Sequence, residues 1–86
     1  MNSSVEISMY PLKEDYKPSI IAFIKNLRKY PFIKVNTNGM STQVFGDYKR
    51  VMNAINTEME NTFINSNAVV FNLKVINVDL EEKPKF

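Results

Sequence analysis

The chain has 86 residues, 11 basic and 9 acidic, with a formal net charge of +2. That length suits one small domain, and so nearly balanced a charge gives no reason to expect binding to nucleic acid or to an anionic membrane. The sequence contains no cysteine and no histidine. It therefore lacks disulfides, thiolate metal ligands and the side chain that most often acts as a general base. We expect no cofactor, no metal and no catalysis.

Hydropathy excludes a transmembrane segment, because no apolar run reaches the roughly 20 residues that span a bilayer. The first six residues, Met-Asn-Ser-Ser-Val-Glu, lack the basic and apolar regions of a secretory signal. The expected location is therefore the cytoplasm.

The first predicted element is a strand over residues 5–10, where apolar and polar side chains alternate. Pro11 should end it, because proline cannot donate a hydrogen bond to a neighbouring strand. A helix follows, with Asp15 as its expected cap and Pro18 in its first turn. Its apolar side chains recur at helical spacing, at Ile20, Phe23, Ile24 and Leu27.

A hairpin is predicted in the middle of the chain. The pair Asn38-Gly39 separates two strand-like runs, 33–37 and 40–45. A two-residue type I′ turn needs positive φ at both central positions, which Asn-Gly adopts at the lowest steric cost. The alternation places Ile33, Val35 and Thr37 on one face of the first arm, and Met40, Thr42 and Val44 on one face of the second.

The last third of the chain predicts a helix and a strand. Asp47 is the expected N-cap of a helix whose apolar positions are four residues apart, at Val51, Ile55, Met59 and Phe63. Residues 68–78 alternate as a strand, and the charged tail 79–86 is expected to be frayed.

The element order β-α-β-β-α-β predicts a single α+β domain over residues 1–86 with the ferredoxin-like arrangement. Two helices should cover one face of a four-stranded antiparallel sheet and leave the other face open. The open face should carry a mixture of polar and apolar side chains: Glu6, Ser8, Tyr10, Asn36, Ser41, Gln43, Phe45, Val70, Asn72, Lys74 and Ile76. Such a mixture is typical of a surface that binds a ligand or a second subunit.

Two short motifs resemble a known family. Ser8-Met9-Tyr10-Pro11 ends the first strand, and the segment from Thr37 to Gly46, T-N-G-M-S-T-Q-V-F-G, spans the hairpin. Together they resemble the thiamine- and hydroxymethylpyrimidine-binding family called YkoF and, more loosely, the thiamine-binding-like proteins of the MTH1187 type. The resemblance extends from Val5 to about Val78.

Proteins of the YkoF kind carry two such units in one chain and bind the pyrimidine part of thiamine. The resemblance therefore implies that this single-unit chain binds thiamine or hydroxymethylpyrimidine and forms a homodimer or tetramer through its sheet face.

A site for an aminopyrimidine needs an apolar or aromatic plate with hydroxyl and amide groups at its edge. The residues expected to bind the ligand are Ser8, Tyr10, Thr37, Ser41, Thr42 and Gln43. Thr42 should face the helices or the sheet edge rather than the open face. Each of these residues also has a purely structural interpretation: the serines as small residues at a packed interface, the threonines as ordinary strand formers, and Tyr10 as interface packing.

Three alternatives to ligand binding remain at this point. The first is a structural or regulatory module whose sheet only mediates self-association. The second is base stacking on sheet aromatics, as in RNA-recognition motifs, although the basic aromatic-rich signature and a high charge are missing. The third is acylphosphatase-type catalysis, which would need an arginine after the first strand, where Lys13, Glu14 and Asp15 stand instead.

Overall fold

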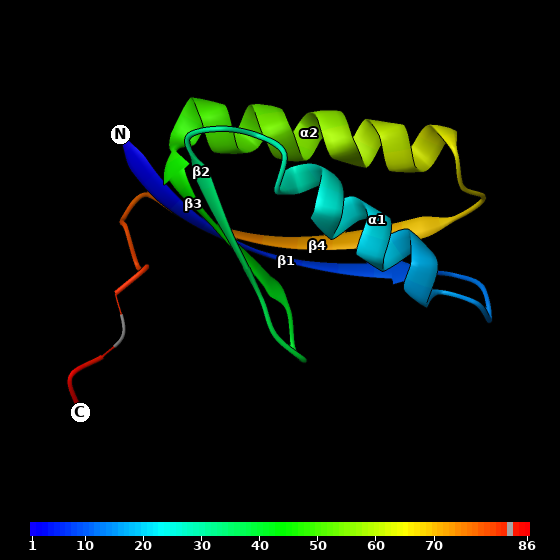
Figure 1. Cartoon of the computed structure of the whole chain (residues 1–86), viewed down its shortest axis with the longest axis horizontal. Helices are drawn as coiled ribbons and strands as arrows, with labels where there is room; N and C mark the ends of the chain where they lie inside the picture. The colour runs from blue at the N-terminus through cyan, green and yellow to red at the C-terminus, as the bar shows by residue number, and fades with distance from the viewer. Residues whose placement is uncertain (83) are drawn as a thin grey trace.

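The computed structural model describes residues 1–82 and 84–86. Six elements follow one another along the chain (Figure 1): β1 (Asn2–Pro11), α1 (Lys17–Leu27), β2 (Ile33–Thr37), β3 (Thr42–Asp47), α2 (Tyr48–Ile64) and β4 (Val69–Ile76). All neighbouring strands are antiparallel, in the order β2-β3-β1-β4. The predicted ferredoxin-like α+β fold is confirmed.

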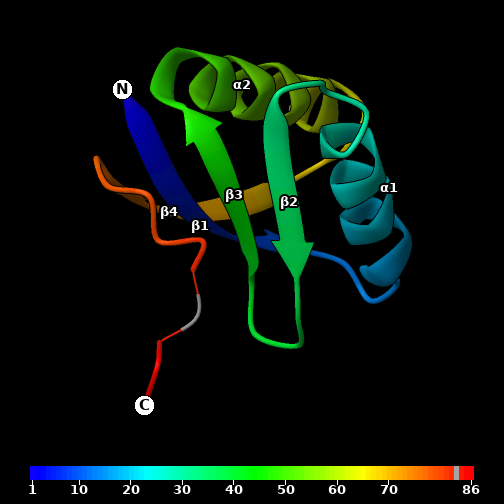
Figure 2. The same ribbon diagram turned by 60° about the vertical axis from the view of Figure 1, so that its left-hand side comes forward.

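Both helices lie on the same side of the sheet, and Figure 2 shows β2 and β3 side by side with α1 beyond β2. No helix among the described residues is long and apolar enough to cross a bilayer. Within the part of the chain that the structure describes, no helix lies on the other side of the sheet, as the sequence predicts.

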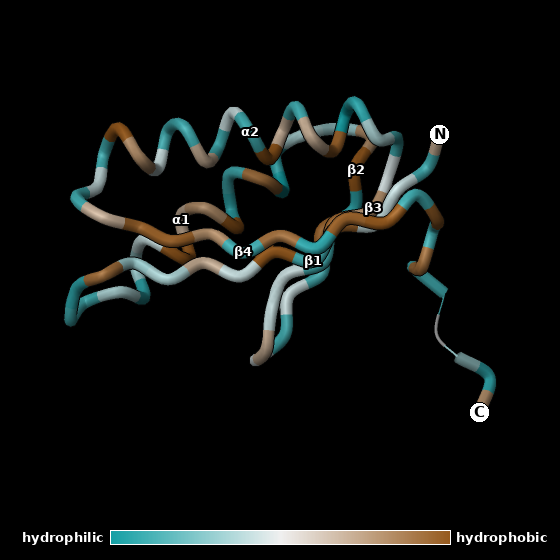
Figure 3. The backbone as a smooth tube through the Cα atoms, turned by 180° about the vertical axis from the view of Figure 1, so that it is seen from behind, coloured by the Kyte–Doolittle hydropathy of each residue, from teal (hydrophilic) through white to brown (hydrophobic). Residues whose placement is uncertain are grey.

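The core lies between the sheet and the two helices. The most hydrophobic stretches of the chain lie in the strands of the sheet (Figure 3). The buried members of the core come from β1, β3 and both helices: Val5, Ile7, Phe23, Leu27, Val44, Val51, Ala54 and Ile55. Phe23 of α1 also packs against Phe71 of β4, with ring centroids 5.0 Å apart. These residues are the apolar positions of the alternating strands and of the helices. Each strand and each helix therefore buries one apolar face in the core, which stabilises that element.

The start of α2 agrees with the prediction, and the start of α1 does not. Asp47 is the N-cap of α2 and accepts a hydrogen bond from the Arg50 backbone N–H at 3.4 Å. In α1 the N-cap is Tyr16, which makes no capping side-chain bond, so the expectation that Asp15 caps this helix is wrong. Pro18 does lie in the first turn, where its missing N–H costs nothing.

The prediction of a type I′ turn is wrong. Neither Asn38 nor Gly39 has positive φ, and the strands pair from Thr37 with Thr42, which leaves a four-residue loop. Two kinds of bond close this loop: the Asn38 backbone N–H donates to the Ser41 carbonyl at 3.1 Å, and the Asn38 Oδ1 accepts from the backbone N–H groups of Met40 and Ser41. The loop is longer than expected by two residues, so the faces of the strands are unchanged and the predicted alternation is still correct.

The C-terminal tail is not frayed at its start. The hydroxyl of Ser4 donates to the Val78 carbonyl at 2.7 Å and accepts from the Leu80 N–H at 2.8 Å. The Lys34 ammonium lies 2.9 Å from the carboxylate of Glu81. Ser4 and Lys34 belong to the face without helices, so residues 78–81 cross one end of it. That end was expected to be open, and Phe45 there is only 9% exposed.

Candidate functional site

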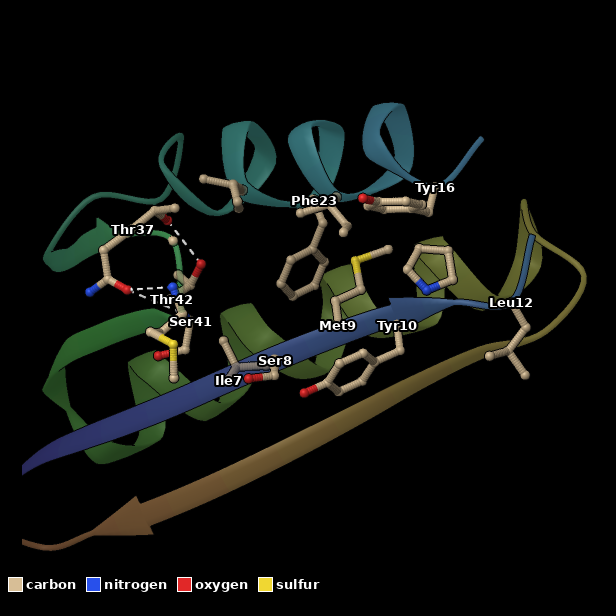
Figure 4. Close-up of a pocket in the computed structure, with 16 residues that line it drawn as sticks. Ile7, Ser8, Met9, Tyr10, Leu12, Tyr16, Phe23, Thr37, Ser41 and Thr42 are labelled. Atoms are coloured by element: carbon tan, nitrogen blue, oxygen red, sulfur yellow. Dashed lines mark hydrogen bonds between the residues drawn. The ribbon is translucent and has the colours of Figure 1, made fainter. Parts of the chain in front are cut away.

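A cavity with a volume of about 540 Å3 lies between the second half of β1, α1 and the hairpin loop (Figure 4). Residues 7–12 form its floor, residues 37–42 one wall, and Tyr16, Ile20, Phe23 and Ile24 its roof. Its size lies within the range of ordinary small-ligand sites, about 300–1,000 Å3.

The cavity exists because two neighbouring strands differ in length. β3 begins at Thr42, which pairs with Ile7, whereas β1 continues to Pro11. Residues 8–11 of β1 therefore have no strand beside them on that side, although β4 pairs with them on the other. The second hairpin arm was predicted to start at Met40. Its later start leaves the gap that α1 then covers.

The lining is uncharged. None of the described residues that line the cavity is acidic or basic. Phe23 in the roof is held in place from behind by its contact with Phe71. The mouth is formed by side chains that stand mostly in solvent, such as Met40 at 88% and Leu12 at 64% exposure. A cavity of this kind suits a neutral, partly apolar molecule, because a charge moved into it would lose hydration without gaining a partner.

Two threonine hydroxyls face each other at the hairpin wall. The Oγ1 atoms of Thr37 and Thr42 lie 2.8 Å apart, and either one can be the donor. Only one of the two protons is used in that bond, so the pair keeps one proton for a further acceptor. Thr42 is buried on the helix side of β3, where it was predicted to lie.

Ser41 belongs to a polar network on the face without helices. Its hydroxyl donates to Glu6 at 2.8 Å and accepts from the Gln43 side-chain amide at 2.8 Å. The other oxygen of Glu6 lies 3.6 Å from the Lys74 ammonium. Ser41 thus has only one lone pair free for a ligand, and Glu6 is not in the lining.

Ser8 and Tyr10 reach the cavity from the other side of β1. By the strand alternation both side chains point away from the helices, and Figure 4 shows Tyr10 and Met9 on opposite sides of the strand. Tyr10 is half exposed. The hydroxyl of Ser8 makes no hydrogen bond with any described residue. The cavity therefore wraps around the free edge of β1 instead of lying on one face.

The structure brings five of the six predicted site residues together at this cavity: Ser8, Tyr10, Thr37, Ser41 and Thr42. Gln43 does not line it and instead supports Ser41. Sequence reasoning placed the site on the open face, so it missed Met9 in the floor and Tyr16 and Phe23 in the roof. Met9 is part of the motif that ends β1, but its side chain has the pattern of a core residue.

Two groups with shifted pKa values lie outside the cavity. The hydrogen bond from the Tyr30 hydroxyl to the carboxylate of Glu58, at 2.7 Å, raises the pKa of Tyr30. A hydrogen bond from the N-terminal ammonium lowers the pKa of Asp47, with help from the Arg50 backbone N–H. Among the described residues no cluster of acidic side chains could hold a metal ion.

No known family model matches the sequence, and no curated protein matches it. Solved structures do resemble it. The hypothetical protein MJ1052 from Methanocaldococcus jannascii is 24% identical with a TM-score of 0.78, over 98% of this chain and 88% of that one. A Thermotoga maritima protein, TM0486, described as a "putative thiamine biosynthesis/salvage protein", is 18% identical with a TM-score of 0.78, over 87% and 82% of the two chains.

A domain of unknown function, DUF77, from Bacillus cereus is 9% identical with a TM-score of 0.75, over 99% of this chain and 84% of that one. At these identities the likeness shows that the fold is shared. The more specific resemblance to YkoF-type proteins stays a prediction from the two motifs.

Proposed function

We propose that this protein is a non-catalytic binding protein for a small neutral heterocycle, with the hydroxymethylpyrimidine part of thiamine as the leading ligand. The observation that carries the proposal is the uncharged cavity at the end of β1. Five residues chosen from sequence motifs in different parts of the chain line this one cavity. The pairing of Ile7 with Thr42 and of Thr37 with Thr42 brings the two motifs side by side, and the start of β3 at Thr42 leaves the hollow between them.

The chemistry of the lining favours the pyrimidine over the complete vitamin. Thiamine carries a cationic thiazolium ring and its diphosphate adds negative charge, whereas hydroxymethylpyrimidine is neutral. No charged side chain lines the cavity to offset either charge, and the nearby carboxylate of Glu6 is already paired with Ser41 and Lys74. The name of the Thermotoga maritima protein connects this fold with thiamine biosynthesis or salvage in that protein, which supports the same ligand class here.

The proposal includes a homodimer or tetramer formed through the part of the sheet face that residues 78–81 leave uncovered. Tyr10 and Val70 are paired neighbours on that face, and they are 50% and 44% exposed. A self-association module with no ligand is the second candidate, because it would use the same apolar side chains. The two candidates differ only at the cavity.

Calorimetric titration distinguishes a ligand-binding protein from a self-association module that binds no ligand. We expect hydroxymethylpyrimidine to bind the wild-type protein more tightly than thiamine, and thiamine diphosphate to bind least. Replacing both threonines, Thr37→Val with Thr42→Val, removes the hydroxyl pair as a unit, which is close to neutral for stability but should weaken binding by roughly tenfold.

Thr62→Val is the matched control, because the Thr62 hydroxyl bonds to the Glu58 carbonyl within α2, away from the cavity. Folded wild-type protein that takes up none of these compounds at millimolar concentration would leave the self-association module as the function.

A further inference from the structure

The free edge of β1 presents backbone groups to the cavity, and two backbone hydrogen bonds at the ends of the strand show which way these groups point. The Leu12 N–H donates to the Ala68 carbonyl at 2.9 Å, next to β4, and the Tyr48 N–H donates to the Met1 carbonyl at 2.8 Å, next to β3. Hydrogen-bonding residues alternate along an antiparallel strand. Even-numbered residues of β1 therefore bond to β4, and odd-numbered residues turn their N–H and C=O toward β3.

Met9 and Pro11 are odd-numbered residues beyond the end of β3. In the register of β1 with β3, the partner of Met9 would be Met40. Met40 is instead in the hairpin loop, where its N–H donates to the Asn38 side chain at 2.8 Å. No described residue bonds to the N–H or C=O of Met9. Pro11 has only a carbonyl, so the edge offers one donor at Met9 followed by two acceptors.

Unpaired peptide groups beside an apolar roof are costly unless water or a ligand satisfies them. A ligand that replaces the missing strand must accept from the Met9 N–H and donate to the Met9 C=O. A ring nitrogen next to an amino group has this pattern. A flat ring bound at a strand edge lies near the plane of the sheet, so one of its faces would be covered by Ile20, Phe23 and Ile24 of α1.

We propose that the backbone N–H and C=O of Met9 recognise a neutral planar heterocycle through a ring nitrogen and its adjacent amino group. The inference rests on the proposed function, since it takes the cavity as the ligand site. Beyond the proposed function, the inference assigns two hydrogen bonds of the ligand to the backbone N–H and C=O of Met9. The hydroxyl of Thr37 or Thr42 then donates to a second acceptor on the ligand.

An extended segment of another protein could also pair with a strand edge. The free edge of β1 is too short for it: only residues 8–11 lack a neighbour, and the hairpin loop closes one end. A ring is therefore the better fit.

Amide hydrogen exchange tests the assignment directly. In the free protein the amide of Met9 should exchange faster than the amides of Ser8 and Tyr10, which bond to β4. Saturation with hydroxymethylpyrimidine or with 4-aminopyrimidine should slow exchange at Met9 by at least tenfold and leave Ser8 and Tyr10 nearly unchanged. A Met9 amide that is already protected without ligand, or that stays fast under saturation, would overturn the inference.

Two affinity measurements complete the test. Met9→Pro removes the N–H that no strand uses, and Met9→Ala is the matched control that shortens the side chain but keeps the N–H. We expect the proline variant to bind roughly tenfold more weakly than the alanine variant. A pyrimidine whose amino group is dimethylated should likewise bind the wild-type protein roughly tenfold more weakly, without any change in the protein.

The outcomes distinguish the two proposals. If hydroxymethylpyrimidine binds but neither the proline substitution nor the dimethylation weakens it, the role of Met9 is refuted and the proposed function stands. If the wild-type protein binds no amino-heterocycle, both are refuted.

Discussion

The carboxylate of Glu58 is the one acidic group that the fold buries among the described residues, at 7% exposure. It projects from α2 and accepts a hydrogen bond from the Tyr30 hydroxyl, just beyond α1. A buried carboxylate without a partner is costly, so this bond links the two helices at a point where the apolar core ends.

Tyr30→Phe should destabilise the protein by about 1–2 kcal/mol, because it leaves the Glu58 carboxylate with one donor fewer. The pKa of Tyr30 is raised in the folded state, so the bond stabilises the fold fully below the ordinary tyrosine pKa of about 10 and is lost as the pH rises through the raised pKa. Urea unfolding at neutral pH and at increasingly alkaline pH measures both effects. The difference between wild type and variant should shrink in alkali, and a difference that is constant with pH would contradict the assignment.

At the scale of elements, the two glycines of the chain have opposite roles. Gly46 lies at the end of β3 with φ +152°, and a Cβ there would lie 3.0 Å from the Phe32 carbonyl oxygen and 3.3 Å from Val51. It lets β3 pass close to the segment that leads into β2. A Cβ on Gly39, in the hairpin loop, would meet nothing within 4 Å.

Gly46→Ala should therefore cost about 1–3 kcal/mol of unfolding free energy, from backbone strain and from the contact with Phe32. Gly39→Ala is the matched control and should change stability by less than about 0.5 kcal/mol. Thermal and urea unfolding of both variants measures this. A large loss at Gly39 would restore the type I′ turn that the Asn-Gly pair predicts from sequence alone, since that turn needs positive φ there.

The hairpin loop separates what could be predicted from the sequence from what could not. The two-residue spacing of Val5 and Ile7, and of Ile33 and Val35, predicted the strands and their faces, because a period of two depends only on neighbouring residues. The predicted loop length was wrong because the Asn38 side chain accepts hydrogen bonds from the backbone N–H groups of Met40 and Ser41, which the Asn-Gly pattern does not reveal. The cavity was not predicted for the same reason. It exists because β3 starts only after the four-residue loop, and the sequence pattern placed that start two residues too early.

The course of the tail could not be predicted either. Ser4 lies 74 residues before Val78, yet its hydroxyl bonds to that carbonyl. A contact so distant in sequence leaves no local pattern. The predicted residues that line the cavity were chosen because their side chains suit a ligand. The backbone of Met9 was not chosen, because every residue has a peptide group and only the missing strand leaves this one unpaired.

At the scale of the whole molecule, the uncovered part of the sheet face should decide the assembly. A domain of this size buries only about 60% or slightly more of its unfolded surface, so it gains from association. Val70→Glu places a charge beside Tyr10 on the uncovered part of the sheet face, and we expect it to shift the assembly to monomers in analytical ultracentrifugation.

Ile21→Glu is the control for that substitution, because Ile21 is 51% exposed on α1, on the other side of the molecule. It should leave the assembly unchanged. A wild-type protein that sediments as a monomer at high concentration would refute the proposed homo-oligomer and leave the cavity as a property of the single chain.

Both proposals require that a neutral heterocycle occupies the gap beside β1, under α1. Mapping backbone amide chemical shifts during a titration with hydroxymethylpyrimidine tests it most directly. If the ligand lies there, we expect the largest shifts in residues 8–12, 16–24 and 37–42, with Met9 among the strongest. Shifts confined to Asn72, Lys74 and the rest of the open face, or no saturable shifts at all, would contradict it.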